Sequence, residues 1–240
     1  MSLFDDPIQE VLAFVEEARE RGALHESASD SARPWPARRT LVLQDDTRFE
    51  LGKPSAESVF ALMWSERLPI GHNRVWRVGP ELRDLPPSGA GFALIPLALV
   101  EPATSTIELF TNLRDAFHRL ELDGLMVRVL PGQQTIWCRV HRDANLDECG
   151  FHAWGAALIQ QLSAVPGVRG VDVLFVSDDP PSLSCLAAPA RRAGRIGGAI
   201  LKLASEPIME CDGCEFADLC RSVAELKRIR AAGLKREAHG

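Results

Sequence analysis

Apolar residues recur at intervals of three and four in several parts of the chain, which is the spacing of one face of an α-helix. In the first such segment Asp6 suits the N-cap and Gly22 suits the end of the helix. The same spacing predicts three further helices later in the chain. The four predicted helices cover residues 6–21, 56–66, 106–121 and 151–165.

Short runs rich in Val, Ile, Leu, Phe and Trp predict strands between these helices. The predicted strands cover residues 39–45, 73–79, 90–101, 125–130, 135–140 and 170–179. Pro96 lies inside one of them and argues for an edge strand or a bend there. Pro131 and Gly132 predict the turn of a hairpin between two others.

This order of elements predicts a mixed α/β fold of the α+β class. Residues 1–38 are expected to form an N-terminal helix followed by a linker rich in Ser, Ala and Pro, and residues 39–180 the main domain. Residues 181–240 are expected to form a helical region that begins with a turn at 180–185. A capping box at Ser222–Glu225 predicts the last helix.

The 240-residue chain carries a formal net charge of -6, which gives no reason to expect nucleic acid or an anionic membrane as a partner. Its acidic N-terminus lacks the pattern of a signal peptide, and its apolar runs are too short for a spanning helix. We therefore expect a cytoplasmic protein. Its six cysteines are then not expected to form a disulfide framework.

Three cysteines, Cys211, Cys214 and Cys220, fall within ten residues and have the spacing C-x2-C-x5-C. Thiolates are soft ligands that bind zinc ions and iron–sulfur clusters. Acidic residues and a glycine surround these cysteines, which is not typical of a core segment. The sequence therefore predicts a metal or cluster site on a loop between two helical stretches.

Three close cysteines and one distant cysteine are typical of a [4Fe–4S] cluster. Cys185, expected in the turn upstream, is the first candidate for the distant ligand, and Cys149 is the second. Cys138 lies in a predicted strand and is expected to be a core residue. Zinc is the alternative metal, although the chain has no second C-x2-C pair and its histidines are scattered.

Motifs in the middle of the chain resemble acetyl-CoA synthase, the β subunit of the CO dehydrogenase/acetyl-CoA synthase complex. Residues 136–158 are similar to a segment of that family that reads W-x-R-x-x-K-D-A, followed by Phe and Gly at fixed distances. The positions that match, with an arginine in place of the lysine, are Trp137, Arg139, Arg142, Asp143, Ala144, Phe151 and Gly155. Three further segments are similar in the same order, Phe49–Pro54, residues 74–85 around Gly79-Pro80-Glu81, and residues 172–179.

The resemblance implies the sheet of that family's central domain, which is implicated in CoA contact, and cysteine ligands after it. It points to Trp137 and Arg139 as residues that contact the adenine nucleotide part of CoA. The alternative, which the sequence favours equally, is that Trp137 packs in the core and Arg139 forms a surface pair. The family joins a methyl group, CO and CoA at a [4Fe–4S] cluster bridged to two nickels. This chain departs from the family's ligand spacing and lacks its Cys-Gly-Cys motif, so nickel is not expected.

Basic residues in a glycine-rich stretch give a second candidate binding site. Arg191, Arg192, Arg195 and Lys202 are suited to a phosphate-bearing ligand such as CoA, although a solvated helix face is the favoured explanation of them. The stretch is not a dinucleotide fingerprint. Asp178 and Asp179, at a predicted strand end, are expected to cap the next element rather than to hold a cation.

Three functions follow from these observations. The first is an iron–sulfur protein related to acetyl-CoA synthase, acting as an accessory, electron-transfer or site-completing subunit with a protein partner. The second is a zinc-stabilised interaction module, in which the metal holds the C-terminal helix. The third is an enzyme that acts on acyl-CoA or one-carbon units.

Overall fold

The computed structural model describes residues 3–36, 41–52, 57–102, 105–130, 135–205 and 214–222, together with residues 226 and 228. The fold is mixed α+β, as predicted. Its helices are α1 (Asp5–Glu20), α2 (Thr106–His118), α3 (Phe151–Ser163), α4 (Pro180–Ser205) and α5 (Ala217–Ser222), with short 3₁₀ turns η1 (Ser29–Ser31), η2 (Gln44–Asp46) and η3 (Leu82–Asp84). Its strands are β1 (Leu24–Ala28), β2 (Thr47–Leu51), β3 (Ser58–Phe60), β4 (Met63–Ser65), β5 (Arg74–Val78), β6 (Phe92–Val100), β7 (Leu125–Leu130), β8 (Thr135–His141) and β9 (Val168–Ser177).

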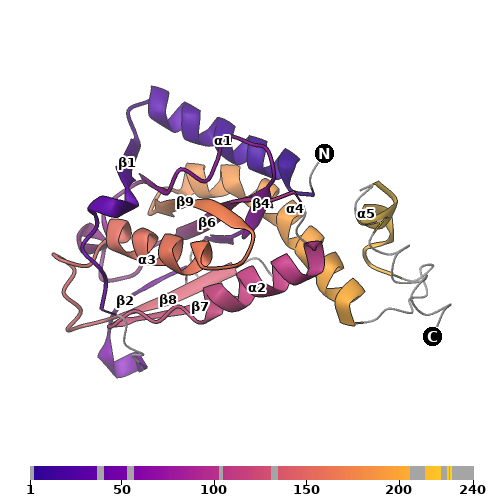
Figure 1. Cartoon of the computed structure of the whole chain (residues 1–240). Coiled ribbons are helices and arrows are strands. Elements are labelled where there is room, and N and C mark those ends of the chain that lie inside the picture. The colour runs from indigo at the N-terminus through magenta and orange to yellow at the C-terminus, as the bar shows by residue number, and fades with distance from the viewer. Residues whose placement is uncertain are drawn as a thin grey trace.

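The larger sheet has the strand order β1-β5-β9-β6, with β3 and β4 both paired to the far side of β6. The β6–β9 pair at its centre is antiparallel, and β5 pairs with β9 in parallel. Every residue from 170 to 177 is buried, so helices cover both faces of the sheet. Helix α3 packs on β9 and β5, while α1 and α4 pack on each other and contact β4 and β3 (Figure 1).

A smaller antiparallel sheet has the order β2-β8-β7, which confirms the predicted hairpin of β7 and β8. The turn predicted at Pro131 and Gly132 lies outside the described residues. Ser58 joins the two sheets, because its hydroxyl donates to the carbonyl oxygen of Ile136 at 2.5 Å and accepts from the Ile136 N–H at 2.8 Å.

The helix predicted over residues 56–66 is wrong, because this segment forms β3 and β4 along one side of β6. Every residue from Val59 to Ser65 is buried, so partner strands rather than helical spacing decide its conformation. The edge position predicted for Pro96 is wrong too, since β6 is paired on both sides. Pro96 lies opposite the interval between the two short strands, where regular pairing stops, which suits a residue without an N–H.

The linker predicted within residues 1–38 is wrong in its first part, because residues 24–28 form β1 and pair with β5. Trp35 is buried, and its indole N–H donates to the carbonyl oxygen of Asp123 at 3.0 Å. One hydrophobic cluster contains residues from all three segments predicted as separate parts. Residues 39 and 40 of the strand predicted over residues 39–45 lie outside the described residues, and the prediction is wrong for the rest, since 41–43 form no regular element and η2 follows.

The turn predicted at residues 180–185 is wrong, because α4 begins at Pro180 and runs for 26 residues. Proline is tolerated in the first turn of a helix, where the backbone N–H has no partner within the helix. Pro189 lies inside α4, so the carbonyl of Cys185 lacks the N–H that would normally bond to it four residues on. Because proline is uncommon in helices, Pro180, Pro181 and Pro189 argue against a helix when the sequence is read alone.

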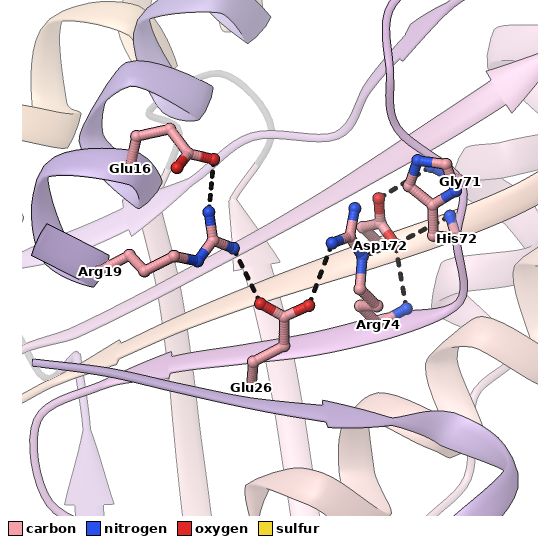
Figure 2. Close-up of polar contacts among 7 residues, drawn as sticks. All are labelled: Glu16, Arg19, Glu26, Gly71, His72, Arg74 and Asp172. Carbon is pink, nitrogen blue, oxygen red and sulfur yellow. Dashed lines mark hydrogen bonds and ion pairs between the residues drawn. The ribbon is translucent and has the colours of Figure 1, made fainter. Parts of the chain in front are cut away.

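A buried carboxylate fixes the loop before β5 (Figure 2). Asp172 in β9 is fully buried and accepts hydrogen bonds from the backbone N–H groups of Gly71, His72 and Arg74 at 2.8 to 3.0 Å. The guanidinium of Arg74 reaches on to Glu26 in β1, which also accepts from Arg19 of α1 at 2.8 Å. These contacts tie α1, β1 and the loop to the central strand. Within the described residues no helix is both long and apolar enough to cross a membrane.

Candidate metal and ligand site

The described cysteines of the C-terminal cluster lie on one short folded segment. Cys214 is half-buried and precedes a turn, whose closing N–H on Ala217 donates to the Cys214 carbonyl oxygen at 3.1 Å. Cys220 is buried within α5, rather than on a loop as predicted. Its N–H donates to the carbonyl oxygen of Phe216 at 2.9 Å. Cys211 lies outside the described residues, as does most of the capping box at Ser222–Glu225.

An ion pair and a ring packed on a glycine are among the contacts that hold this segment to the second half of α4, and Figure 1 draws α5 to the right of that helix. Arg195 donates to both carboxylate oxygens of Asp218 at 2.9 and 2.8 Å. This bonding lowers the pKa of Asp218. Beside it, the ring of Phe216 lies where a Cβ on Gly198 would be only 2.9 Å away. The absence of a side chain at residue 198 therefore lets the ring rest on the helix backbone.

The other cysteines lie elsewhere. Cys185 is exposed near the start of α4, ten residues before Arg195, and a rise of 1.5 Å per residue separates the two by about 15 Å along the helix. Among the described residues, Cys185, Cys214 and Cys220 are not gathered as one group of metal ligands. Cys149 is buried and lines a different cavity. Cys138 is fully buried in β8, where burial raises the pKa of its thiol, as expected of a core residue.

The donor set suits a thiophilic metal as far as the structure describes it. Cys214 and Cys220 sit six positions apart on a turn and the helix that follows it, and Cys211 precedes Cys214 by three residues. Among the described residues, no three His, Cys, Asp or Glu side chains are gathered as metal ligands. The two described thiols alone do not make a complete site.

A cavity of about 460 Å³ lies beside the cysteine segment, between α2 and the second half of α4. Phe216 and Glu215 form part of its wall, so the residues directly after Cys214 face it. Arg195 and Lys202, two of the four basic residues singled out in the sequence, also line it. The other two do not: Arg191 is exposed, and Arg192 pairs with Glu10 of α1.

Trp137 and Arg139, the pair suggested for CoA contact, are engaged with one another. The Arg139 guanidinium lies 4.5 Å from the centre of the Trp137 ring, and its Nε donates to Glu50 at 2.7 Å. They lie in β8, the central strand of the smaller sheet, and neither lines the cavity beside the cysteines. Their contacts are those of a sheet surface.

Two further observations concern polar residues. Asp179 caps α4 as expected, because its Oδ1 accepts from the N–H of Ser182 at 3.2 Å. Sequence reasoning missed a contact between Ser27 and His152, whose Oγ and Nδ1 are 2.6 Å apart. These two residues are 125 positions apart, and the pairing of β1 with β5 together with the packing of α3 on β5 brings them into contact.

Comparison with known proteins adds no relative. No family model matches the chain, and no curated protein sequence matches it. The resemblance to acetyl-CoA synthase therefore stays a prediction that rests on the ordered motifs alone.

Proposed function

We propose that this chain is an iron–sulfur protein that holds a [4Fe–4S] cluster through Cys211, Cys214 and Cys220. In this proposal it is an accessory, electron-transfer or site-completing subunit in one-carbon or acyl-CoA metabolism. It works with a protein partner in the cytoplasm. The ordered motifs that resemble acetyl-CoA synthase suggest the pathway, and the thiols suggest the cofactor.

One observation carries the proposal. Cys214 and Cys220 belong to a single segment that α4 holds through Asp218 and Phe216, so their spacing is part of a folded unit. A half-buried and a buried thiol next to an apolar cavity suit a cluster, whose sulfides are protected from water in such surroundings.

The fourth ligand of the cluster is either Cys185 or a group from outside this chain. Cys185 would reach the other thiols only if the segment from Cys214 to Ser222 lay against the first half of α4 instead of the second. The alternative is an iron whose fourth position is filled by a partner's side chain or a small thiol. The two cases differ in the behaviour of Cys185→Ala.

A structural zinc is the second candidate, and the exposed contact between α5 and α4 favours it. The Arg195–Asp218 pair that joins the two helices is exposed to solvent, and exposed ion pairs contribute little to stability. Zinc bound to the thiols would supply the missing free energy and would hold the segment to α4. In that case the chain is an interaction module, and the metal is colourless.

The test is metal and sulfide analysis of anaerobically purified protein, before and after reconstitution. A [4Fe–4S] cluster predicts about four iron and about four sulfide per chain, with absorption near 400 nm. Cys214→Ala and Cys220→Ala should lose the cluster. Cys185→Ala is the matched control, and a cluster that survives it excludes Cys185 as a ligand.

Zinc at about one per chain without iron would favour the second candidate. Protein that takes up neither metal would overturn both.

A further inference from the structure

The cavity between α2 and α4 has the dimensions and walls of a small-molecule site. Its volume of about 460 Å³ is within the range of roughly 300 to 1,000 Å³ that ligand pockets occupy. Four phenyl rings line it, those of Phe60, Phe110, Phe117 and Phe216. An apolar body placed among these rings would be removed from water on several sides, which is the main source of affinity for such ligands.

Glycines of α4 create this space. A Cβ on Gly197 would lie 2.8 Å from the ring of Phe110, and one on Gly198 would lie 2.9 Å from the ring of Phe216. Both rings therefore rest directly on the backbone of α4, and Gly194 lines the cavity one turn earlier. The glycine-rich stretch, which is no dinucleotide fingerprint, forms the floor of a hydrophobic cavity.

The charged residues around the cavity favour an anion. Lys202 has no carboxylate in ion-pair range among the described residues, and Arg114 meets only its sequence neighbour Asp115, at 3.4 Å. Arg195 is already engaged by Asp218, and Glu215 adds one negative charge to the wall. Asp115 partly offsets the charge of Arg114, so Lys202 is the cation of this wall that is most open to an anion among the described residues.

His118 adds a polar group to the same wall. Partial burial and, to a lesser extent, the charge of Arg114 lower the pKa of His118, which favours the neutral ring at neutral pH. A neutral imidazole can donate one hydrogen bond without adding charge. The polar side of the cavity thus offers two cations and one neutral donor.

We propose that this cavity binds a medium-chain monocarboxylic acid, with its hydrocarbon chain among the four phenyl rings and its carboxylate bonded to Lys202 and Arg114. Charge-assisted hydrogen bonds from the two cations select the anion, and the rings select an apolar chain over a short polar acid. Binding of the acid needs no metal at the cysteines, so a test of this binding is independent of the proposed cluster.

Isothermal titration of the full chain with decanoate tests this, on protein as purified and on protein treated with chelator. We expect one site per chain, with decanol and butyrate each binding at least about 10-fold more weakly, the first for lack of charge and the second for lack of chain. Lys202→Gln should weaken decanoate binding about 10-fold. Arg191→Gln, an exposed cation on the same helix that does not line the cavity, should leave it unchanged.

A variant that fills the cavity completes the design. Leu201 lines the cavity and is half-buried, so Leu201→Trp places an indole there without replacing a core residue. We expect this variant to melt like the unmodified protein and to lose decanoate binding. The inference is overturned if decanoate does not bind, if decanol binds equally well, or if Lys202→Gln has no effect. Metal analysis of the same samples reports on the cluster independently.

Discussion

Arg195 in α4 donates hydrogen bonds to both carboxylate oxygens of Asp218 in α5, at 2.9 and 2.8 Å. The pair lies between two features that matter for function. Asp218 is two residues from Cys220, and Arg195 lines the cavity whose wall includes Phe216. A metal bound at the thiols and a ligand bound in the cavity would therefore both lie next to the contact between α4 and α5.

The first prediction concerns this contact. Hydrogen bonding from Arg195 lowers the pKa of the native Asp218 carboxyl group, and Asp218→Asn removes the carboxylate charge and weakens both bonds. We expect the backbone amides of residues 214–222 to exchange with deuterium faster, while α1 and the central strands are unaffected. Because the pair is exposed, the melting temperature should hardly change. Equal exchange in Asp218→Asn, Arg191→Gln and the unmodified protein would show that the Arg195–Asp218 pair does not hold the segment.

Asp172 gives the second prediction. Its carboxylate satisfies three backbone N–H groups of the loop from Gly71 to Arg74, and Asp172→Ala leaves these groups buried without an acceptor. We expect the free energy of unfolding to fall by about 3 kcal/mol, measured by urea denaturation at pH 7. Asp147→Ala, at an exposed carboxylate, is the control and should change it by less than about 0.5 kcal/mol. A loss below about 1 kcal/mol for Asp172→Ala would mean that water replaces the carboxylate.

Glu26 leads to a prediction about pH. Partial burial raises the pKa of Glu26, but the hydrogen bonds from Arg19 and Arg74 lower it by more, so it lies below its ordinary value of 4.5. The folded state therefore binds the proton less tightly than the unfolded state does. The ionised group adds stability above pH 4.5, and this stability is lost as the pH falls through the lower pKa of the folded state.

Glu26→Gln isolates this effect from all other carboxyl groups. Urea denaturation between pH 3 and pH 7 should show the variant less stable than the unmodified protein at pH 6 to 7. The difference should shrink as the pH falls below 4.5, and it should be lost below the lower pKa of the folded state, where both side chains are uncharged. A difference that is constant over the whole range would assign the effect of the substitution to packing instead of charge.

The sequence predicted those elements whose own residues determine them. Helices α2 and α3 carry a clear 3.6-residue spacing, and β6 and β9 are long apolar runs, so each was found close to its actual bounds. Strand β1 was missed because its residues alternate poorly. Its place depends on pairing with β5 and on Glu26, which only the folded chain brings beside Arg19 and Arg74.

The candidate site was predictable to a similar degree. The spacing of Cys214 and Cys220 predicts that the two lie on one segment, because residues close in sequence lie close in space in almost any fold. Cys185 was placed in a turn near them, since Pro180 and Pro181 hide the start of a helix that carries it away. The cavity could not be predicted, because its walls come from α2, α4 and β3, and its floor exists only where rings rest on glycines.

The last prediction tests such a close approach between a glycine and its neighbours in the core. A Cβ on Gly155 of α3 would lie 2.6 and 2.7 Å from the two methyl groups of Val75 in β5, and 3.2 Å from the ring of Phe175. Alanine is the better helix former by up to about 1 kcal/mol, but the forced shift costs about 1 to 3 kcal/mol. We expect Gly155→Ala to lower the free energy of unfolding by about 1 kcal/mol.

A double-mutant cycle separates the two contributions. Val75→Ala alone leaves a cavity and is destabilising, by about 2 kcal/mol. In the double variant the new methyl group of residue 155 enters the space that the valine methyls leave, so the two losses should not add. Urea denaturation of the four proteins should give a favourable coupling of about 1 kcal/mol or more. If the losses add instead, α3 moves off the sheet without resistance, and the glycine does not set the distance between α3 and β5.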